Sequence, residues 1–106
     1  MSTIFSKIIN RELPAKIIYE DDRIIAIEDK FPQSKGHFLV IPKKFAVNLE
    51  DINDDELTYL MLKARELAKK QIKHIGVSGF NLVVNSGKSA GQEIMHIHVH
   101  IVPAKK

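Results

Sequence analysis

Three of the five histidines in this chain alternate with apolar residues in the stretch HIHVHIV, residues 96–102. On an extended strand successive side chains point to opposite faces, so His96, His98 and His100 would share one face and the apolar side chains the other. Neutral imidazole is nucleophilic near pH 7, and a neighbouring imidazole can hold one tautomer or supply a proton. The pattern therefore favours phosphoryl-transfer chemistry by an imidazole nucleophile.

Two other interpretations of the alternating histidines stay open. A pair of histidines two residues apart on a strand can chelate zinc. Such a site would need a further ligand, and the chain holds no cysteine. The three side chains could also be ordinary exposed or hydrogen-bonded histidines, which is the usual interpretation of a single histidine but a weaker one for three in strict alternation.

The loop SGKSAGQ, residues 86–92, comes shortly before the histidines. It carries two glycines, small residues and one lysine, a composition that can turn backbone N–H groups toward an anion. It is not a Walker A loop, because Leu82 stands where that motif has glycine and because a strand, not a helix, is expected to follow. A flexible hairpin turn is the alternative, but beside the histidines we favour a phosphate-binding loop.

The amino-terminal half of the chain predicts one short helix and three strands. A helix is expected at residues 4–10 and ends before Pro14, which disfavours a helical residue in front of it. Two isoleucine-rich strands, residues 15–20 and 23–29, flank an acidic turn and are typical of a hairpin. Residues 37–43 form a third strand, and their nearly continuous apolar run indicates that both faces are covered.

The clearest predicted element is a long helix between Asn53 and Gly76. Apolar residues recur along it at three- and four-residue intervals and define one buried face. Asn53 can cap the helix with Glu56 reaching back to it, Ile52 can pack against Leu57, and Gly76 supplies the stop.

Two more strands are expected at residues 80–85 and 94–102. Together the elements predict an α+β fold with a five-stranded, mainly antiparallel sheet, one long helix and one short helix. No linker or repeat divides the chain, so residues 1–106 are expected to form a single domain. A domain of this size buries only about two-thirds of its unfolded surface, which makes pairing with a second copy reasonable.

Composition limits the partners and the location of the protein. Sixteen Lys and Arg against thirteen Asp and Glu give a net charge of +3, and this scattered excess does not predict direct nucleic-acid binding. No apolar run approaches the ~20 residues that a membrane helix needs. With no cysteine in the chain, a cytoplasmic location and no membrane association are expected.

The stretch HIHVHIV matches the pattern His-φ-His-φ-His-φ-φ, with φ apolar, and so resembles the histidine triad (HIT) family. Residues 4–44 resemble the amino-terminal half of the Hint branch of that family, and residues 80–101 resemble its carboxy-terminal half. The resemblance implies a HIT-like fold, a homodimer in which two five-stranded sheets continue across the interface, and a purine nucleotide site in each subunit. It implies no cofactor and no catalytic metal.

The resemblance also implies catalytic roles for four histidines. His98 would attack an α-phosphate and form a nucleotidyl-histidine, which water then hydrolyses. His100 would contact the phosphate oxygens and help the leaving group, while His96 and the distant His37 would orient the others.

The nucleotide-binding residues implied by the resemblance fall into three groups. Asp29 would accept the ribose hydroxyls, with Lys30 beside it, and Asn85 would hold the phosphate on the leaving-group side. The apolar wall against the base and the phosphate loop complete the set, which comprises Phe5, Ile8, Ile27, Gly91, Gln92 and Glu93.

Four positions depart from the family pattern. Glu93 stands where several Hint proteins have a hydroxyl residue that donates to the leaving group, and a carboxylate donates only when it is protonated. Thr3 and Ser6 stand where some relatives carry zinc-binding cysteines, so no structural zinc is expected. Phe45 stands where a histidine is often found.

The leading function hypothesis is a purine nucleoside phosphoramidate hydrolase that releases AMP from adenosine phosphoramidates. A dinucleoside polyphosphate hydrolase, like the fragile-histidine-triad branch, is the second hypothesis. The third comes from a different class: a nucleotide-binding interaction protein with weak catalysis.

Overall fold

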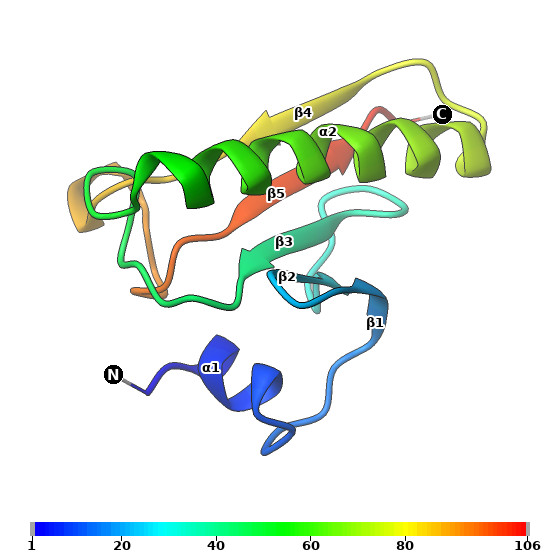
Figure 1. Cartoon of the computed structure of the whole chain (residues 1–106). Helices are drawn as coiled ribbons and strands as arrows, with labels where there is room; N and C mark the ends of the chain where they lie inside the picture. The colour runs from blue at the N-terminus through cyan, green and yellow to red at the C-terminus, as the bar shows by residue number, and fades with distance from the viewer. Residues whose placement is uncertain (1, 106) are drawn as a thin grey trace.

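The long helix α2, Asp54–Ile75, covers one face of the sheet (Figure 1). The structure is a computed structural model in which residues 2–105 are described. As predicted, the Asn53 side chain accepts the Glu56 N–H, and Gly76 ends the helix in the left-handed conformation at φ 79°. The prediction that the Glu56 side chain reaches back to the cap is wrong. Its carboxylate accepts from Arg23 at 2.9 Å instead, because a charged donor outcompetes a backbone N–H.

Five strands form one antiparallel sheet, which confirms the predicted α+β class. Their spatial order is β1-β2-β3-β5-β4, so β5 lies between β3 and β4. Every neighbouring pair is antiparallel. The strands are β1 Ile17–Glu20, β2 Ile24–Glu28, β3 Phe38–Pro42, β4 Phe80–Val83 and β5 Val99–Pro103.

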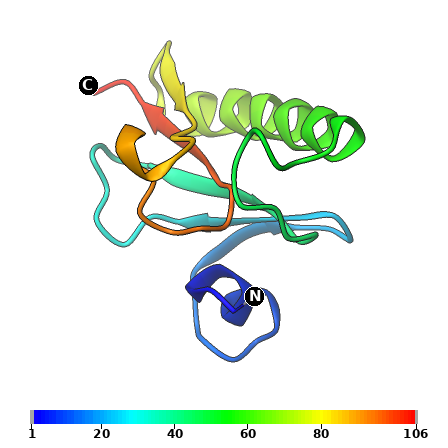
Figure 2. The same ribbon diagram turned by 90° about the vertical axis from the view of Figure 1, so that its left-hand side faces the viewer.

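Strands β2 and β3 are buried on both faces. Alternate residues of β2 and β3, such as Ala26 and Val40, belong to the apolar cluster under α2. The residues between them, such as Ile25 and Leu39, belong to a second cluster under α1, Ile4–Ile9. Figure 2 shows the two helices on opposite sides of the sheet. This double burial explains the continuous apolar run of the third strand.

The short helix α1 begins at a reciprocal cap. The Thr3 hydroxyl accepts the Ser6 N–H at 3.1 Å, and the Ser6 hydroxyl accepts the Thr3 N–H at 2.7 Å. Phe5 and Ile8 are buried against the sheet. Six residues are too few for a stable isolated helix, so this packing together with the cap holds α1 in place.

The last two strands are shorter than the sequence predicts. β4 ends at Val83 rather than at residue 85, and β5 begins at Val99 rather than at residue 94. The segment between them contains a short 3-10 helix, Lys88–Ala90, in the expected loop. The alternation of side chains alone could not show where the pairing with the neighbouring strands starts.

The residues just before β5 bond to a loop instead of to a strand. The N–H of Ile97 donates to the carbonyl of Ala46 at 2.8 Å. The alternation nevertheless survives, because Ile97 belongs to the cluster under α2. His96 and His98, on either side of it, contact the ring of Phe5 on the other face of the sheet. Two of the three histidines are therefore placed by a loop and not by the strand.

Within residues 2–105, no helix is both long and apolar enough to cross a membrane. β1 and β4 are the edge strands of the sheet. An edge strand offers unpaired backbone groups to a second chain. Continuation of the sheet across a homodimer stays a prediction.

Candidate active site

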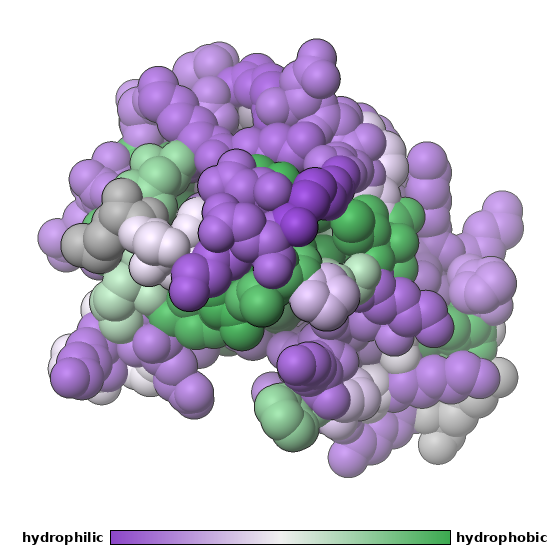
Figure 3. All heavy atoms as spheres, turned by 90° about the horizontal axis from the view of Figure 1, so that it is seen from below, coloured by the Kyte–Doolittle hydropathy of each residue, from purple (hydrophilic) through white to green (hydrophobic). Residues whose placement is uncertain are grey.

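A cavity of about 1380 Å³ opens on the face of the sheet that carries α1. Figure 3 views the molecule from this side and shows apolar side chains in the middle of the face, with hydrophilic residues around them. Ten of the predicted site residues line the cavity: Phe5, Ile8, Ile27, Asp29, Lys30, Asn85, Gly91, Glu93, His98 and His100. Three others, His37, Gln92 and His96, lie behind its wall and are exposed by 2% or less.

His98 presents one free ring nitrogen. Its Nδ1 lies 2.9 Å from the carbonyl oxygen of His96. Because a carbonyl only accepts, Nδ1 carries the proton and the lone pair of the neutral ring is on Nε2. Burial lowers the pKa of His98 below its usual value of 6.5, with smaller opposing effects from the bond to His96 and from Asp29 and Glu93. His98 is therefore neutral at pH 7, with its lone pair on Nε2.

His37 and His100 form a second hydrogen-bonded pair. The backbone N–H of Gln33 donates to Nδ1 of His37 at 3.1 Å. The proton of His37 is therefore on Nε2, which donates to Nδ1 of His100 at 3.0 Å. Burial is the main cause that lowers the pKa of both histidines. Neutral His100 thus keeps its own proton on Nε2, where it can donate to a ligand in the cavity.

Asp29 lies next to this pair and raises the question of a metal ion. Its Oδ2 is 3.4 Å from Nε2 of His37 and 3.9 Å from Nδ1 of His100. These three side chains could supply metal ligands. However, a ring nitrogen that carries a proton cannot bind a metal, and the Gln33 N–H forces the proton of His37 onto Nε2. The hydrogen-bond pattern therefore favours a proton between the two rings over an ion.

His96 is held from both sides. Its Nε2 donates to the carbonyl of Pro42 at 2.9 Å, which leaves Nδ1 to accept from the Thr3 hydroxyl at 3.3 Å. The rings of Phe5 and Phe45 meet it edge-on, with centroids 6.0 and 5.2 Å away. His96 does not line the cavity. It positions His98 through its own backbone carbonyl.

The predicted phosphate loop is built differently from the expectation. The N–H groups of Ala90, Gly91 and Gln92 donate to carbonyls within the same turn. The Gln92 amide also serves the loop, because it accepts from the Gly87 N–H at 2.9 Å and donates to the Ile94 carbonyl at 3.0 Å. These N–H groups therefore do not face an anion as predicted. They rigidify the turn so that Gly91 forms a smooth part of the cavity wall.

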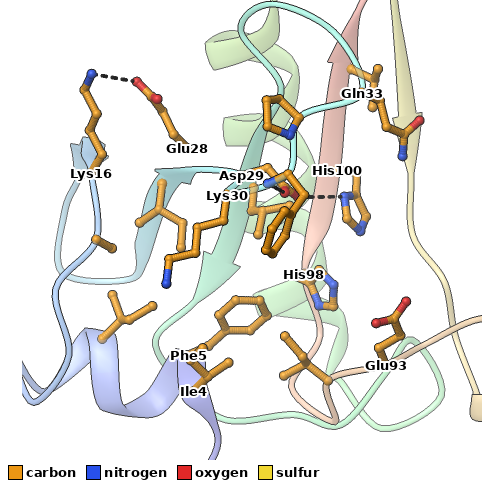
Figure 4. Close-up of a pocket in the computed structure, with 18 of the residues that line it drawn as sticks. Ile4, Phe5, Lys16, Glu28, Asp29, Lys30, Gln33, Glu93, His98 and His100 are labelled. Carbon is orange, nitrogen blue, oxygen red and sulfur yellow. Dashed lines mark hydrogen bonds and ion pairs between the residues drawn. The ribbon is translucent and has the colours of Figure 1, made fainter.

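The two ends of the cavity differ in character (Figure 4). One end is apolar, formed by α1 and β2 with Phe5, Ile8 and Ile27, and the Lys30 side chain extends beside it. At the other end Glu93 points toward His98 from the side of β4 and β5. His98 and His100 lie between the two ends.

Several residues of the site were missed by the sequence analysis. Thr3, Gln33 and Pro42 fix histidine protons, and each does so through a contact that joins distant parts of the chain or a backbone group. Sequence spacing carries no signal for such contacts. By contrast, the alternation along β5 could have placed Val102 on the face of His100. Other lining residues absent from the prediction are Ile4, Leu13, Asn81 and Val83.

Comparison with known proteins identifies the family. Residues 10–106 match the HIT domain, and the chain therefore belongs to the HIT family. A HIT-like protein of Mesomycoplasma hyorhinis, described as uncharacterised, is 52% identical over 103 residues, which is 97% of this chain and 93% of that protein.

Solved structures agree with this assignment. A hypothetical histidine triad nucleotide-binding protein of Sulfolobus tokodaii superposes with a TM-score of 0.92 at 42% identity, over 96% of this chain and 68% of that one. A HIT family hydrolase of Legionella pneumophila superposes with a TM-score of 0.85 at 37% identity, over 99% and 95% of the two chains. The predicted HIT-like fold is confirmed.

Proposed function

We propose that this protein hydrolyses purine nucleoside 5′-phosphoramidates to AMP and an amine through a covalent intermediate on His98, as in the Hint branch. The observation that carries the proposal is the hydrogen bond from Nδ1 of His98 to the carbonyl of His96. It leaves the Nε2 lone pair of a neutral imidazole at the wall of the cavity. Such a nitrogen is suited to attack phosphorus.

The reaction takes two displacements. The Nε2 lone pair of His98 forms a bond to the α-phosphorus as the P–N bond of the substrate breaks, and the departing amine takes up a proton. Water then attacks the phosphorus, releases a proton and frees AMP, which returns His98 to its neutral form. The Nε2–H of His100 and the amide of Asn85 donate to the phosphoryl oxygens, where charge accumulates.

The remaining lining residues hold the nucleoside. Phe5, Ile8 and Ile27 form the apolar wall against the base. Asp29 accepts the ribose hydroxyls on its Oδ2, which has no backbone donor within residues 2–105, while its Oδ1 accepts from the Phe31 N–H at 2.8 Å. Lys30 lies beside the ribose and the base. No metal or other cofactor takes part.

The related proteins support the general class of this proposal. One relative carries the name of a nucleotide-binding protein and another that of a hydrolase. Both descriptions fit a nucleotide hydrolase. The phosphoramidate substrate, the Hint branch, the homodimer and the cytoplasmic location are our further proposals, as is the absence of nucleic-acid and membrane partners.

A dinucleoside polyphosphate hydrolase is the second candidate. A specific observation favours it: the cavity of about 1380 Å³ exceeds the usual size of a single-ligand site, roughly 300–1,000 Å³. Its charges oppose it, because a polyphosphate needs cations and the lining holds only two lysines, Lys16 and Lys30. A nucleotide-binding protein with weak catalysis is the third candidate.

The deciding experiment follows AMP release from adenosine 5′-phosphoramidate and, separately, from a diadenosine polyphosphate, both in the presence of EDTA. Wild type is compared with His98→Ala and with His74→Ala, a matched control at an exposed position of α2. We expect release from the phosphoramidate that is lost in His98→Ala alone. A preference for the diadenosine compound would move the assignment to the second candidate. Tight AMP binding without His98-dependent release from either compound would support the third.

A further inference from the structure

We propose that Glu93 selects substrates by the charge of the leaving group, so that amines carrying an additional positive charge are preferred and anionic leaving groups are rejected. The inference rests on the proposed phosphoramidate hydrolysis. Glu93 lines the cavity, and its carboxylate points toward His98 (Figure 4). The position lies in the segment between β4 and β5, close to where phosphorus would react.

The charges around the cavity are distributed unevenly. Lys16 pairs with Glu28 at 3.4 Å, so these two charges largely cancel. The Lys30 side chain extends beside the apolar end, and Asp29 lies next to His100, with 3.9 Å between its Oδ2 and Nδ1 of that ring. Among the lining residues contributed by β4, β5 and the segment between them, Glu93 is the only one with a permanent charge.

Glu93 is also free to meet a ligand. Its side chain is exposed, and no ion pair joins it to another side chain within residues 2–105. Its charge acts on the reactive centre, because it partly opposes the lowering of the pKa of His98 and His100. A carboxylate that influences both rings would also act on a group attached to the phosphorus between them.

The leaving group must face the Glu93 end of the cavity. The apolar wall of Phe5, Ile8 and Ile27 takes up the base, and a nucleotide bound there brings its α-phosphorus to His98. In an in-line displacement the leaving group points away from the attacking nitrogen and from the nucleoside. On the side of β4 and β5, Asn81, Val83 and Val102 line the cavity next to Glu93 and leave room for such a group.

A carboxylate in this place attracts an ammonium group and repels an anion. For a partly solvated pair each effect is modest, so we expect a change of about fivefold in kcat/KM between leaving groups that differ by one charge. The effect should weaken at high salt, since screening acts on exposed charges. The same repulsion acts against the further phosphates of a dinucleoside polyphosphate.

The test uses adenosine phosphoramidates of three amines of similar length: putrescine, pentylamine and γ-aminobutyrate. Their leaving groups carry a positive charge, no charge and a negative charge at the far end. For wild type we expect kcat/KM to fall in that order. In Glu93→Gln the three values should converge, and in Glu93→Lys the order should reverse.

A control distinguishes Glu93 from Glu28, another carboxylate that lines the cavity. Glu28→Gln removes the carboxylate at the opposite side and should keep the wild-type order of the three substrates. An unchanged order in Glu93→Gln, or equal rates for all three substrates in wild type, would overturn the inference while His98-dependent hydrolysis still stands. Loss of His98 dependence for every substrate would instead contradict the proposed function.

Discussion

Nε2 of His37 lies 3.0 Å from Nδ1 of His100, although 63 residues separate the two along the chain. Antiparallel pairing of β3 with β5 brings them together, since His100 is registered with Leu39, two residues after His37. The N–H of Gln33 behind His37 determines the direction of the proton. A backbone group thus sets which nitrogen of His100 can donate into the cavity.

His37→Phe should lower kcat about 10- to 100-fold with little change in KM, because the imidazole of His100 loses the hydrogen-bond partner that orients it. Phenylalanine fills the buried site but cannot donate to His100. His37→Gln restores a donor and should recover part of the rate. Steady-state kinetics and the pH profile of kcat separate this role from simple destabilisation, which would change the amount of active protein but not the profile.

Thr3→Val should reduce activity more than Ser6→Ala does. Both changes break the reciprocal cap of α1, at a cost of about 1 kcal/mol in the free energy of unfolding. Only Thr3 also donates to Nδ1 of His96, so only Thr3→Val loosens the ring whose carbonyl holds His98. Urea unfolding and kcat measured on both variants make the comparison. Equal loss of kcat in the two would contradict a positioning role for Thr3.

Stability should fall as the pH drops below 6.5. Burial lowers the pKa of His37, His96, His98 and His100 in the folded chain. Between these lowered values and 6.5 the unfolded chain binds more protons than the folded one, so the free energy of unfolding decreases as the pH falls. The contribution of the histidines to stability is therefore complete above pH 6.5 and is lost below it. Urea unfolding at about pH 5 and pH 8 measures the difference. His96→Asn should reduce the difference, and His74→Asn should leave it unchanged.

A separate acid-induced loss of stability should come from Asp21. Burial raises the pKa of its carboxyl, but hydrogen bonds from the Tyr59 hydroxyl, the backbone of Arg23 and Ile24, and the Tyr19 hydroxyl outweigh this effect and lower it to about 2. A lowered carboxyl pKa stabilises the fold above 3.8 and ceases to do so as the pH falls toward 2. In Asp21→Asn the pH dependence in this range should be flatter. Thermal unfolding between those values is the measurement, and an unchanged slope would contradict the prediction.

Gly91→Ala should destabilise the protein by roughly 1–2 kcal/mol and lower activity. Gly91 has φ 95°, a left-handed conformation that side chains disfavour, and an added Cβ would lie 3.9 Å from Asn85. Gly79→Ala is the matched control, because Gly79 has no positive φ and no atom within 4 Å of an added Cβ. Equal stability of the two variants, measured by urea unfolding, would contradict the role assigned to the turn.

The sequence predicted those parts of the molecule that depend on periodic patterns. The bounds of α2 follow from its apolar spacing and from its caps at Asn53 and Gly76. The orientation of His98 and His100 toward the face of the sheet opposite α2 follows from the alternation of side chains. The start of β5 did not follow, because it depends on the bond between Ile97 and Ala46, which no local pattern encodes.

The contacts that determine which ring nitrogen of each histidine carries the proton could also not be predicted from the sequence. They involve the N–H of Gln33 and the carbonyls of Pro42 and His96, backbone groups that nearly every residue type offers. The function of Gln92 shows the same limit. A resemblance put it in the phosphate loop, whereas its amide is buried, accepts from the Gly87 N–H and donates to the carbonyls of Ile94 and Val47.

The strand order β1-β2-β3-β5-β4 also determines when the site can form during protein synthesis. On the ribosome, β1, β2 and β3 can pair as each is made, because they are neighbours both in the chain and in the sheet. β4 is made next but has no partner until β5 follows and enters between it and β3. A growing chain therefore carries an unpaired β3 edge and an unpaired β4 until the histidines themselves emerge.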